Sequence, residues 1–326
     1  MDFDFAGELP KLWQMLVAIA AFVAVVGGLL FVLDLAPRWG RDRWYVIGFL
    51  GPALLLLTIG LIIPALRTLV LSFKDGESVN WVGLDNYTWM FEQDEIFLVL
   101  RNTAIWVILV PLVATTVGLV YAVLVDRAKL EYLAKSLIFM PMAISFVGAS
   151  IIWKFMYAYR GAEQDQIGLL NQLVVWVGGE PKQWLNDPPT NTLFLIAILV
   201  WIQAGFAMVV LSAAIKAIPN DIVEAARLDG VNAWQMFWRV TLPSVRPAVV
   251  VVLVTISIAT LKLFDIVRTT TNGNFETGVI ATEMYNQAFR FGQAGHGSAL
   301  AVFLFVLVIP IVIYQVRILR QRREIR

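Results

Sequence analysis

The sequence contains no cysteine, a single histidine and few charged residues, which make up 15% of its 326 residues. Without cysteine the chain can form no disulfide, thiolate metal site or cysteine nucleophile. His296 lies in a glycine-rich stretch, residues 292–297, where we expect a solvated loop residue rather than a metal ligand or a catalytic base. The net charge of +1 argues against a nucleic-acid partner. We therefore predict no catalytic residue, no metal site and no cofactor in this chain.

Apolar residues take the place of the missing charges and make up 59% of the chain. A soluble domain carries about 25% charged residues, so this composition indicates a membrane protein. Seven apolar segments are long enough to cross a hydrocarbon core of about 30 Å. They are residues 12–33, 45–66, 103–125, 136–157, 192–218, 247–267 and 298–318. We predict an all-α, polytopic membrane protein with about seven transmembrane helices.

Basic residues are divided unevenly between the two sides that these segments define. Fifteen of the 25 lysines and arginines lie in residues 34–44, 126–135, 216–246 and 317–326, and eight lie in the connections on the other side. Cytoplasmic loops of membrane proteins carry an excess of basic residues. We therefore expect a multi-pass protein whose N-terminus lies outside and whose C-terminus lies in the cytoplasm.

A polar stretch, residues 219–243, separates the fifth apolar segment from the sixth. Asp221 and Glu224 have the spacing of a capping box and follow a proline, which predicts that a helix begins there. Gly230 suits the left-handed residue that ends such a helix. By the basic-residue count, this helix lies at the cytoplasmic face.

A second short helix is predicted directly after the glycine. Asn232 with Gln235 repeats the start signal, and Pro243 is expected to end the helix. We expect the aromatic side chains of this helix to pack it back onto the membrane helices. These side chains are Trp234, Phe237 and Trp238.

The same stretch resembles the EAA loop of ABC-importer permeases, whose pattern is E-A-A, three residues, G, nine residues and I-x-L-P. Residues 224–226 supply the E-A-A, Gly230 follows, and residues 240–243 close the pattern with Val240 in place of isoleucine. In that family the loop transmits movement from an ATPase. The resemblance assigns this coupling role to Glu224, Ala225, Ala226, Asp229 and Gly230.

The resemblance also implies an organisation and a set of partners. Residues 45–318 would form a type I importer permease core of six helices, residues 1–44 an extra N-terminal helix with its linker, and residues 319–326 a basic tail. The chain lacks a G-x-x-x-x-G-K-[ST] phosphate loop, so ATP and Mg²⁺ are expected on partner ATPase subunits. A second homologous permease, an extracytoplasmic sugar-binding protein and the lipid of a bacterial or archaeal cytoplasmic membrane complete the expected surroundings.

The sixth apolar segment carries an unusual number of polar residues for a membrane helix. Ser257 and Thr260 recur at helical spacing, and Lys262 and Asp265 are three residues apart, so they can form an ion pair. Polar groups inside a membrane helix usually face a cavity or a neighbouring helix. A structural Lys262–Asp265 pair and a direct contact with the substrate both remain open.

Resemblance to permeases of the maltose type extends this candidate path to the fourth and fifth segments. Several of the matching positions are apolar where the maltose permease is polar, so its sugar contacts do not carry over one by one. The substrate path that we expect comprises Met142, Phe146, Ile202, Gln203, Ser257, Thr260, Lys262, Leu263 and Asp265.

The connection between the fourth and fifth segments is rich in aromatic residues, among them Tyr157, Tyr159, Trp176 and Trp184. Such residues form interfacial belts in membrane proteins, although a docking surface for an extracytoplasmic partner is also consistent with them. The region after the sixth segment looks like that of α-glucoside permeases, but Gly273, Asn274 and Phe275 replace the usual G-G-P.

These features together predict a permease subunit of an ATP-driven carbohydrate importer, with an oligosaccharide of the α-glucoside kind as the favoured substrate. Trehalose, maltose-like oligosaccharides and glycerol-phosphate compounds remain open. The transport path would open alternately to each side as separate ATPase subunits hydrolyse ATP. The alternative is a stand-alone secondary transporter or channel for a small polar solute. That class predicts an ionic site at the membrane midplane, for which the Lys262–Asp265 pair is the only support.

Overall fold

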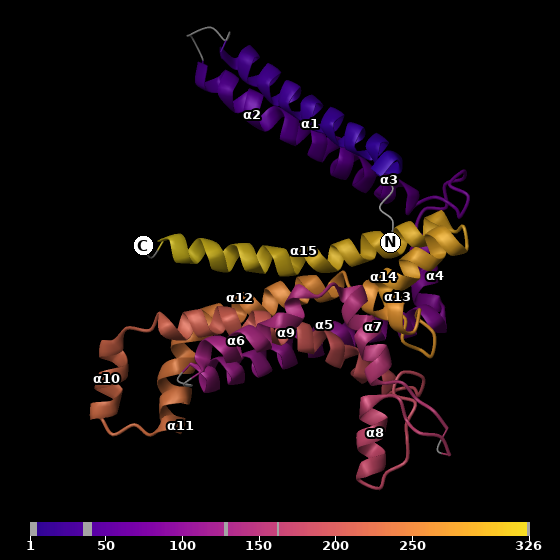
Figure 1. Cartoon of the computed structure of the whole chain (residues 1–326). Helices are drawn as coiled ribbons and strands as arrows, with labels where there is room; N and C mark the ends of the chain where they lie inside the picture. Colours follow the sequence, from indigo (N-terminus) through magenta and orange to yellow (C-terminus); the bar gives the residue numbers. More distant parts are fainter. Residues whose placement is uncertain (1–4, 35–40, 127–129, 162, 325–326) are drawn as a thin grey trace. The chain divides into compact units, whose positions relative to one another are not determined.

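The computed structural model describes residues 5–34, 41–126, 130–161 and 163–324. Helices are the regular elements of this part, together with one isolated bridge between Lys74 and Trp81. The chain divides into two compact units, Met1–Arg67 and Thr68–Arg326 (Figure 1). Five helices are long and apolar enough to cross a membrane, or six if one bent pair counts as a single span.

The N-terminal unit consists of α1 (Phe5–Asp34), α2 (Arg41–Leu57), a π turn (Thr58–Ile62) and most of α3 (Ile63–Leu71). The second predicted segment lies in the continuous helix Gly48–Leu71, which is long enough to span a membrane. The first lies in α1, whose described apolar part, Trp13–Gly28, is shorter than a span.

The main unit is built around α5 (Asp94–Val125) and α9 (Asn191–Lys216), which pack closely along their length. At Gly118 on α5, an added Cβ would lie 2.8 Å from the backbone nitrogen of Met208, so only glycine permits this approach. Trp106 and Leu199 are among the fully buried side chains of the resulting core. Helices suit this setting because lipid satisfies no backbone hydrogen bonds.

Two further long helices and several short ones complete the described part of the bundle and its ends. α12 (Leu242–Leu261) packs on α5 and α9, and α15 (Ala294–Glu324) packs on α12. The remaining helices are shorter. They are α4 (Asp85–Glu92), α8 (Leu169–Trp176), α10 (Asn220–Leu228), α11 (Ala233–Met236) with the π turn Phe237–Thr241, α13 (Asp265–Thr270), and α14 (Ile280–Tyr285) with the π turn Asn286–Arg290.

The fourth predicted segment lies in a bent pair of helices rather than in one straight helix. α6 (Glu131–Phe139) continues through a 3₁₀ turn (Met140–Ala143) and is bent by 102° from α7 (Phe146–Met156). Pro141 lies in the turn and lacks a backbone N–H for a continuing helix. The Ser145 hydroxyl then accepts a hydrogen bond from the Gly148 backbone N–H at 3.0 Å and starts a new helix.

Two further boundaries differ from the sequence-based expectation. The sixth segment does not run to residue 267, because α12 stops at Leu261 and α13 begins only at Asp265. His296 is not a solvated loop residue, because it lies in the first turn of α15 and stacks on Trp89 with the ring centroids 3.8 Å apart.

Candidate coupling loop and transport path

α10 and α11 form a two-helix loop at one end of the long helices (Figure 1). The loop turns at Gly230, whose φ is +76°. The Val231 N–H donates to the Ala226 carbonyl at 3.2 Å, and the Gly230 N–H donates to the Arg227 carbonyl at 3.0 Å. These two bonds are those of a Schellman motif, which satisfies the last carbonyls of a helix. The predicted role of Gly230 as the left-handed residue is confirmed.

The start of α11 is also as predicted, and α10 begins directly after Pro219 as predicted, but without the expected capping box. The Asn232 side chain accepts from the Gln235 N–H at 2.9 Å, and the Gln235 side chain accepts from the Asn232 N–H at 3.0 Å. The residue that caps α10 is Pro219, and its first turn has no side-chain capping bond. The prediction of a capping box at Asp221 and Glu224 was therefore wrong, although Asp221 still lies in the first turn, where the helix dipole favours a carboxylate.

The second helix of the loop does not end at Pro243. α11, its π turn and α12 form one continuous helix, Ala233–Leu261. The proline sits in the first turn of α12, just after the Leu242 N–H has bonded to the Phe237 carbonyl in the wider π geometry. The second helix of the loop therefore continues without a break into the long apolar helix α12.

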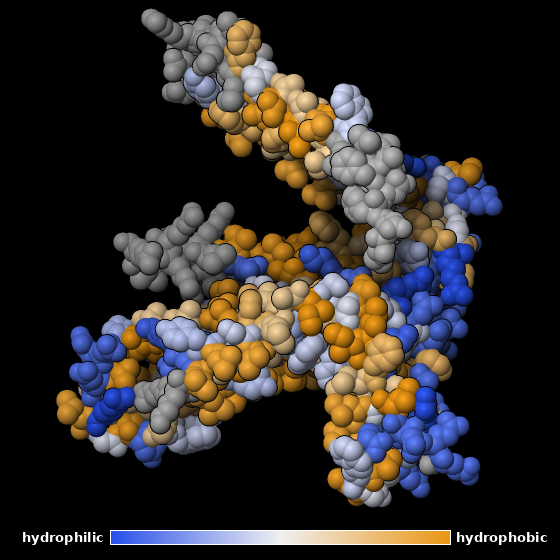
Figure 2. All heavy atoms as spheres, viewed as in Figure 1, coloured by the Kyte–Doolittle hydropathy of each residue, from blue (hydrophilic) through white to orange (hydrophobic). Residues whose placement is uncertain are grey.

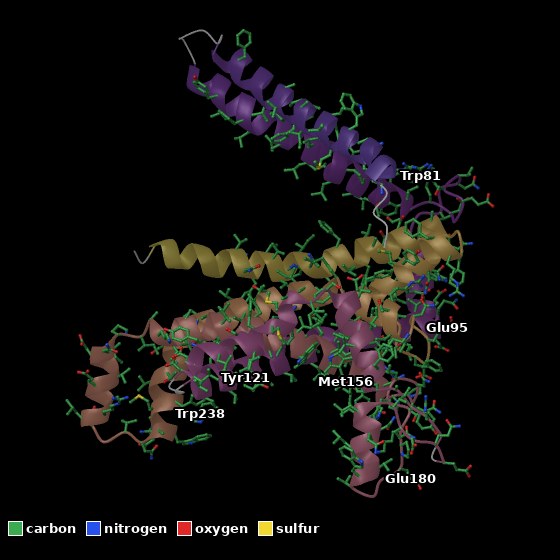
Figure 3. The ribbon with its side chains drawn as sticks, viewed as in Figure 1. Trp81, Glu95, Tyr121, Met156, Glu180 and Trp238 are labelled. Atoms are coloured by element: carbon green, nitrogen blue, oxygen red, sulfur yellow. The ribbon has the colours of Figure 1, made fainter. Side chains whose placement is uncertain are left out.

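Apolar side chains of the loop are exposed in this chain. Leu228 is 89% exposed and Trp234 is 71% exposed. Trp234 and Trp238 pack on each other at 5.5 Å, and Figure 3 shows Trp238 at this end of the molecule. The expectation that these two tryptophans pack onto the membrane helices was wrong, whereas Phe237 is half-buried. Exposed apolar surface of this kind marks a site for a partner.

The five residues assigned to coupling lie on this same loop. Four of them are exposed and Ala226 is half-buried. Within the part of the chain that the structure describes, the carboxylates of Glu224 and Asp229 take part in no ion pair. The exposed residues are Glu224, Ala225, Asp229 and Gly230.

A cavity of about 430 Å³ lies between the loop and the ends of α5 and α9. Arg227 of α10, Lys216 of α9 and Asp126 at the end of α5 are among the residues that line it. Among the described residues, the buried Asp126 Oδ1 atom accepts no hydrogen bond, and the Lys216 Nζ atom lies 3.8 Å from it. Asp126, at the end of α5, and Arg227, on α10, therefore line the same cavity.

An ion-pair network ties α6 to α9 beside this cavity. The Lys216 ammonium donates to Glu131 at 2.5 Å, and Lys135 donates to Glu131 at 2.6 Å and to the Ser212 hydroxyl. Sequence reasoning counted these lysines only for topology and missed the network. The four-residue spacing of Glu131 and Lys135 was its one local signal.

The predicted substrate path is brought together only in part. Phe146, Ile202 and Leu263 belong to one apolar cluster of the core. Gln203 and Thr260 are buried, whereas Met142 is exposed. The structure therefore gathers side chains from α7, α9 and the end of α12.

The two hydroxyls of the path bond to their own helix. Ser257 donates to the Leu253 carbonyl at 2.9 Å, and Thr260 donates to the Ile256 carbonyl at 2.8 Å. Each hydroxyl oxygen can still accept a hydrogen bond from a ligand.

Lys262 is not inside a membrane helix, so that premise was wrong. It is the residue that ends α12, and its side chain is exposed, while Asp265 starts α13 and is half-buried. Among the described residues, ion pairs join Lys135 and Lys216 to carboxylates, and Lys262 and Asp265 do not pair. An exposed lysine at a helix end has no need of a buried partner.

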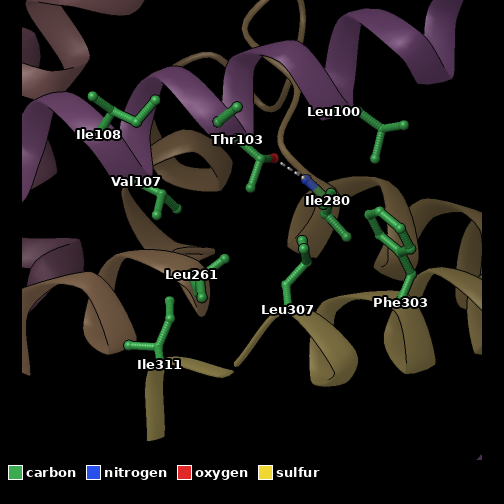
Figure 4. A pocket seen from close by; sticks show the side chains of 10 residues that line it. Leu100, Thr103, Val107, Ile108, Leu261, Ile280, Phe303, Leu307 and Ile311 are labelled. Carbon is green, nitrogen blue, oxygen red and sulfur yellow. Dashed lines mark hydrogen bonds between the residues drawn. The ribbon is translucent and has the colours of Figure 1, made fainter. Parts of the chain in front are cut away.

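An apolar cavity of about 330 Å³ lies between α5, α14 and α15 (Figure 4). It is lined by residues such as Leu100, Phe303 and Leu307, and none of the predicted path residues reaches it. The Ile280 N–H donates to the Thr103 hydroxyl at 3.0 Å and fixes the start of α14 against α5. This cavity is apolar throughout and offers no groups that would recognise a polar solute.

The connection after α13 is held by two buried asparagines that sequence reasoning did not assign. Asn102 of α5 donates to the Glu276 carbonyl at 2.6 Å and to the Gly278 carbonyl at 3.1 Å. Asn191 of α9 donates to the Phe275 carbonyl at 2.6 Å. Phe275 and Glu276 have φ values of +56° and +59°, a conformation that side chains disfavour and that these bonds stabilise.

The connection after α3 is ordered by one carboxylate. Asp75 accepts from the Val79 N–H at 2.8 Å and from the Asn80 backbone at 3.1 Å. The bond from Val79 holds the pKa of Asp75 below its usual value. Val79 itself projects outward and is exposed.

A bundle of membrane-length helices, with an exposed two-helix loop joined rigidly to one of them, is the architecture of the membrane subunit of a transporter. Residues 114–324 match the family of binding-protein-dependent transport system inner membrane components, and the chain belongs to this family. The all-α, multi-pass permease fold predicted from the sequence is confirmed.

Similar proteins agree with this placement. The chain is 48% identical to the osmoprotective compounds uptake permease protein GgtC of Synechocystis, over 85% of this chain and all of that protein. It is 48% identical to the alpha-glucoside transport system permease protein AglF of Rhizobium meliloti, over 82% of this chain and 80% of that protein. Its fold matches a chain of a bacterial alginate ABC transporter, solved in complex with an alginate pentasaccharide-bound periplasmic protein. That match has a TM-score of 0.74 and 23% identity, and covers 85% of this chain and 94% of the other.

Proposed function

We propose that this chain is the permease subunit of an ATP-driven carbohydrate importer for α-glucoside-like solutes. The alpha-glucosides named for the Rhizobium relative support this substrate class. An ATPase subunit seats on the α10–α11 loop and carries the ATP and Mg²⁺, and a second permease and an extracytoplasmic sugar-binding protein complete the transporter. The loop and the C-terminus lie in the cytoplasm, and the N-terminus lies outside.

The continuous helix Ala233–Leu261 is the observation that carries the coupling proposal. Force applied to the exposed loop reaches the far end of α12 through one continuous helix. There the helix stops, and Leu263 lies in one apolar cluster with side chains of α7 and α9. Movement of this end opens and closes the path between Phe146, Ile202 and Leu263.

Nothing in the structure favours the alternative of a stand-alone secondary transporter or channel. That reading rested on a Lys262–Asp265 pair at the membrane midplane. The described residues form no such pair, and Lys262 is an exposed helix end.

Co-purification tests the assignment of the loop. The chain is expressed with the ATPase and second permease encoded nearest to it, and Leu228→Asp places a charge on the most exposed apolar side chain of the loop. We expect this variant to lose the ATPase subunit on purification and to keep the second permease. The control Val79→Asp changes an exposed apolar residue at the other end and should keep both. Retention of the ATPase by Leu228→Asp would remove this loop from the contact.

A further inference from the structure

The short helix α8 lies in the connection between α7 and α9, at the end of the bundle away from the α10–α11 loop (Figure 1). It runs across the direction of α9 and projects sideways from the long helices. Since α7 ends at Met156 and α9 begins at Asn191, the whole connection starts and finishes at one face of the membrane. A helix in this position is held close to the level of the lipid headgroups.

A single buried asparagine fixes which side of α8 packs against the rest of the connection. The Asn171 amide donates to the Ala158 carbonyl at 2.9 Å and to the Lys182 carbonyl at 3.1 Å. Its oxygen accepts from the Lys182 N–H and from the Trp184 indole N–H, both at 2.9 Å. All four hydrogen-bonding positions of the side chain are used. The side of α8 that carries Asn171 is therefore locked against the loop formed by residues 178–190.

The opposite side of α8 is apolar and uncovered. Leu169, Leu173 and Trp176 recur at helical spacing, and Val177 extends the stripe. Trp176 is 70% exposed and Val177 is 85% exposed. α8 contains no charged residue, whereas the surrounding connection carries exposed acidic residues such as Glu180 and Asp187. In Figure 2 the hydrophilic surface gathers on the loop side of this projection.

We propose that α8 is an in-plane membrane anchor, whose stripe of Leu169, Leu173, Trp176 and Val177 inserts into the phospholipid leaflet at this face. The helix that precedes this connection, α7, likewise exposes apolar side chains, among them Val147, Ile151 and Phe155. The Trp176 indole N–H is the only hydrogen-bonding group on the stripe, and tryptophan suits the boundary between acyl chains and headgroups.

A lipid leaflet fits the stripe better than a protein partner does. Protein interfaces surround an apolar centre with a polar rim, and the polar groups of this connection lie on the other side of α8. An amphipathic helix in the interface buries its apolar face about 5–10 Å into the boundary of headgroups and acyl chains. Through Asn171, the depth of α8 would set the position of the α7–α9 connection relative to the membrane.

Site-directed spin labelling tests the anchor, and the absence of native cysteine makes every label unique. A nitroxide is placed at Leu173→Cys and, as the water-facing control, at Glu180→Cys. The full transporter is reconstituted in phosphatidylglycerol and phosphatidylcholine nanodiscs, and collision of the label with oxygen and with a water-soluble nickel chelate is measured. We expect the oxygen-to-nickel ratio to be several-fold higher at position 173 than at position 180.

Each other result overturns the proposal. A label at position 173 that collides freely with nickel would place α8 in water. Low collision with both reagents would show that a protein covers the stripe. As an independent check, the oxygen-to-nickel collision ratio of a label at Val177→Cys should fall when Leu173→Asp is added. The ratio should stay unchanged when Gln183→Asp is added on the polar loop. A monodisperse gel-filtration profile confirms that each variant is folded.

Discussion

Replacement of Gly230 tests whether the turn between α10 and α11 depends on its left-handed backbone. A Cβ added at this position would meet no atom within 4 Å, so space does not restrict it. The restriction is the φ of +76°, which asparagine adopts readily and valine does not. Proline is confined to a φ near −65°, and it also removes the N–H that donates to the Arg227 carbonyl.

The cost of each substitution follows from these two features. A left-handed residue other than glycine or asparagine costs about 1–2 kcal/mol. Loss of the hydrogen bond adds about 0.5–1.5 kcal/mol. For Gly230→Pro the sum is about 1.5–3.5 kcal/mol, which corresponds to a roughly 10- to 300-fold larger population of the opened loop. α10 has nine residues and little helical stability of its own, so the loop opens while the bundle stays folded.

Limited trypsin digestion measures this opening, because cleavage after Arg227 follows the open population when opening and closing are fast. We expect wild type and Gly230→Asn to be cleaved at similar rates, Gly230→Val faster and Gly230→Pro fastest. Gly83 also has a positive φ and open space around it, and Gly83→Val should leave cleavage after Arg227 unchanged. Cleavage of the Gly230→Pro protein at the wild-type rate would refute the reasoning.

Three further predictions concern the rest of the structure. Asn102→Ala leaves the carbonyls of a strained connection without a donor, at about 1–3 kcal/mol for each unpaired group, and should lower the Tm in detergent. Glu131→Gln removes the charge of the acceptor that Lys135 and Lys216 share, and it should also lower the Tm. Asp126→Asn removes the charge of a carboxylate whose buried Oδ1 accepts no hydrogen bond from the described residues, and it should leave the Tm unchanged or raise it. Val79→Cys should react with an impermeant maleimide on intact cells, and Gln235→Cys should not.

These three predictions fail in distinct ways. A Tm unchanged by Asn102→Ala would show that the connection after α13 is held by other contacts. A Tm that falls with Asp126→Asn would show that this carboxylate stabilises the loop's attachment. Equal labelling of Val79→Cys and Gln235→Cys would contradict the topology. Val79 is the better outer probe than Gly76, because a side chain at Gly76 would collide with Gln293.

The parts of the coupling loop that depend on local chemistry could be predicted from the sequence. Gly230 and the Asn232–Gln235 box act within a few residues, so their spacing is enough. Pro243 was misjudged because its effect depends on the π turn before it, which no sequence pattern announces. Lys262 was misplaced because hydropathy does not show where a helix ends within an apolar run.

Contacts between distant residues were beyond the reach of sequence reasoning. Asn102 bonds to a carbonyl 174 residues away, and Lys216 reaches Glu131 across 85 residues. The residues of each pair lie too far apart in the chain for a single sequence to show that they meet. Pro141 is itself a sequence signal for the bend, but the apolar run continues on both sides of it, so hydropathy did not show the change of direction.

Uptake by proteoliposomes tests the central claim most directly. The transporter is reconstituted with its ATPase subunits, ATP is enclosed on the side of the α10–α11 loop, and a labelled α-glucoside is supplied with its binding protein on the other side. The account predicts uptake that requires enclosed ATP and is lost in the Leu228→Asp and Gly230→Pro variants. Uptake of the same sugar without ATP, or by this chain in the absence of any ATPase subunit, would contradict it.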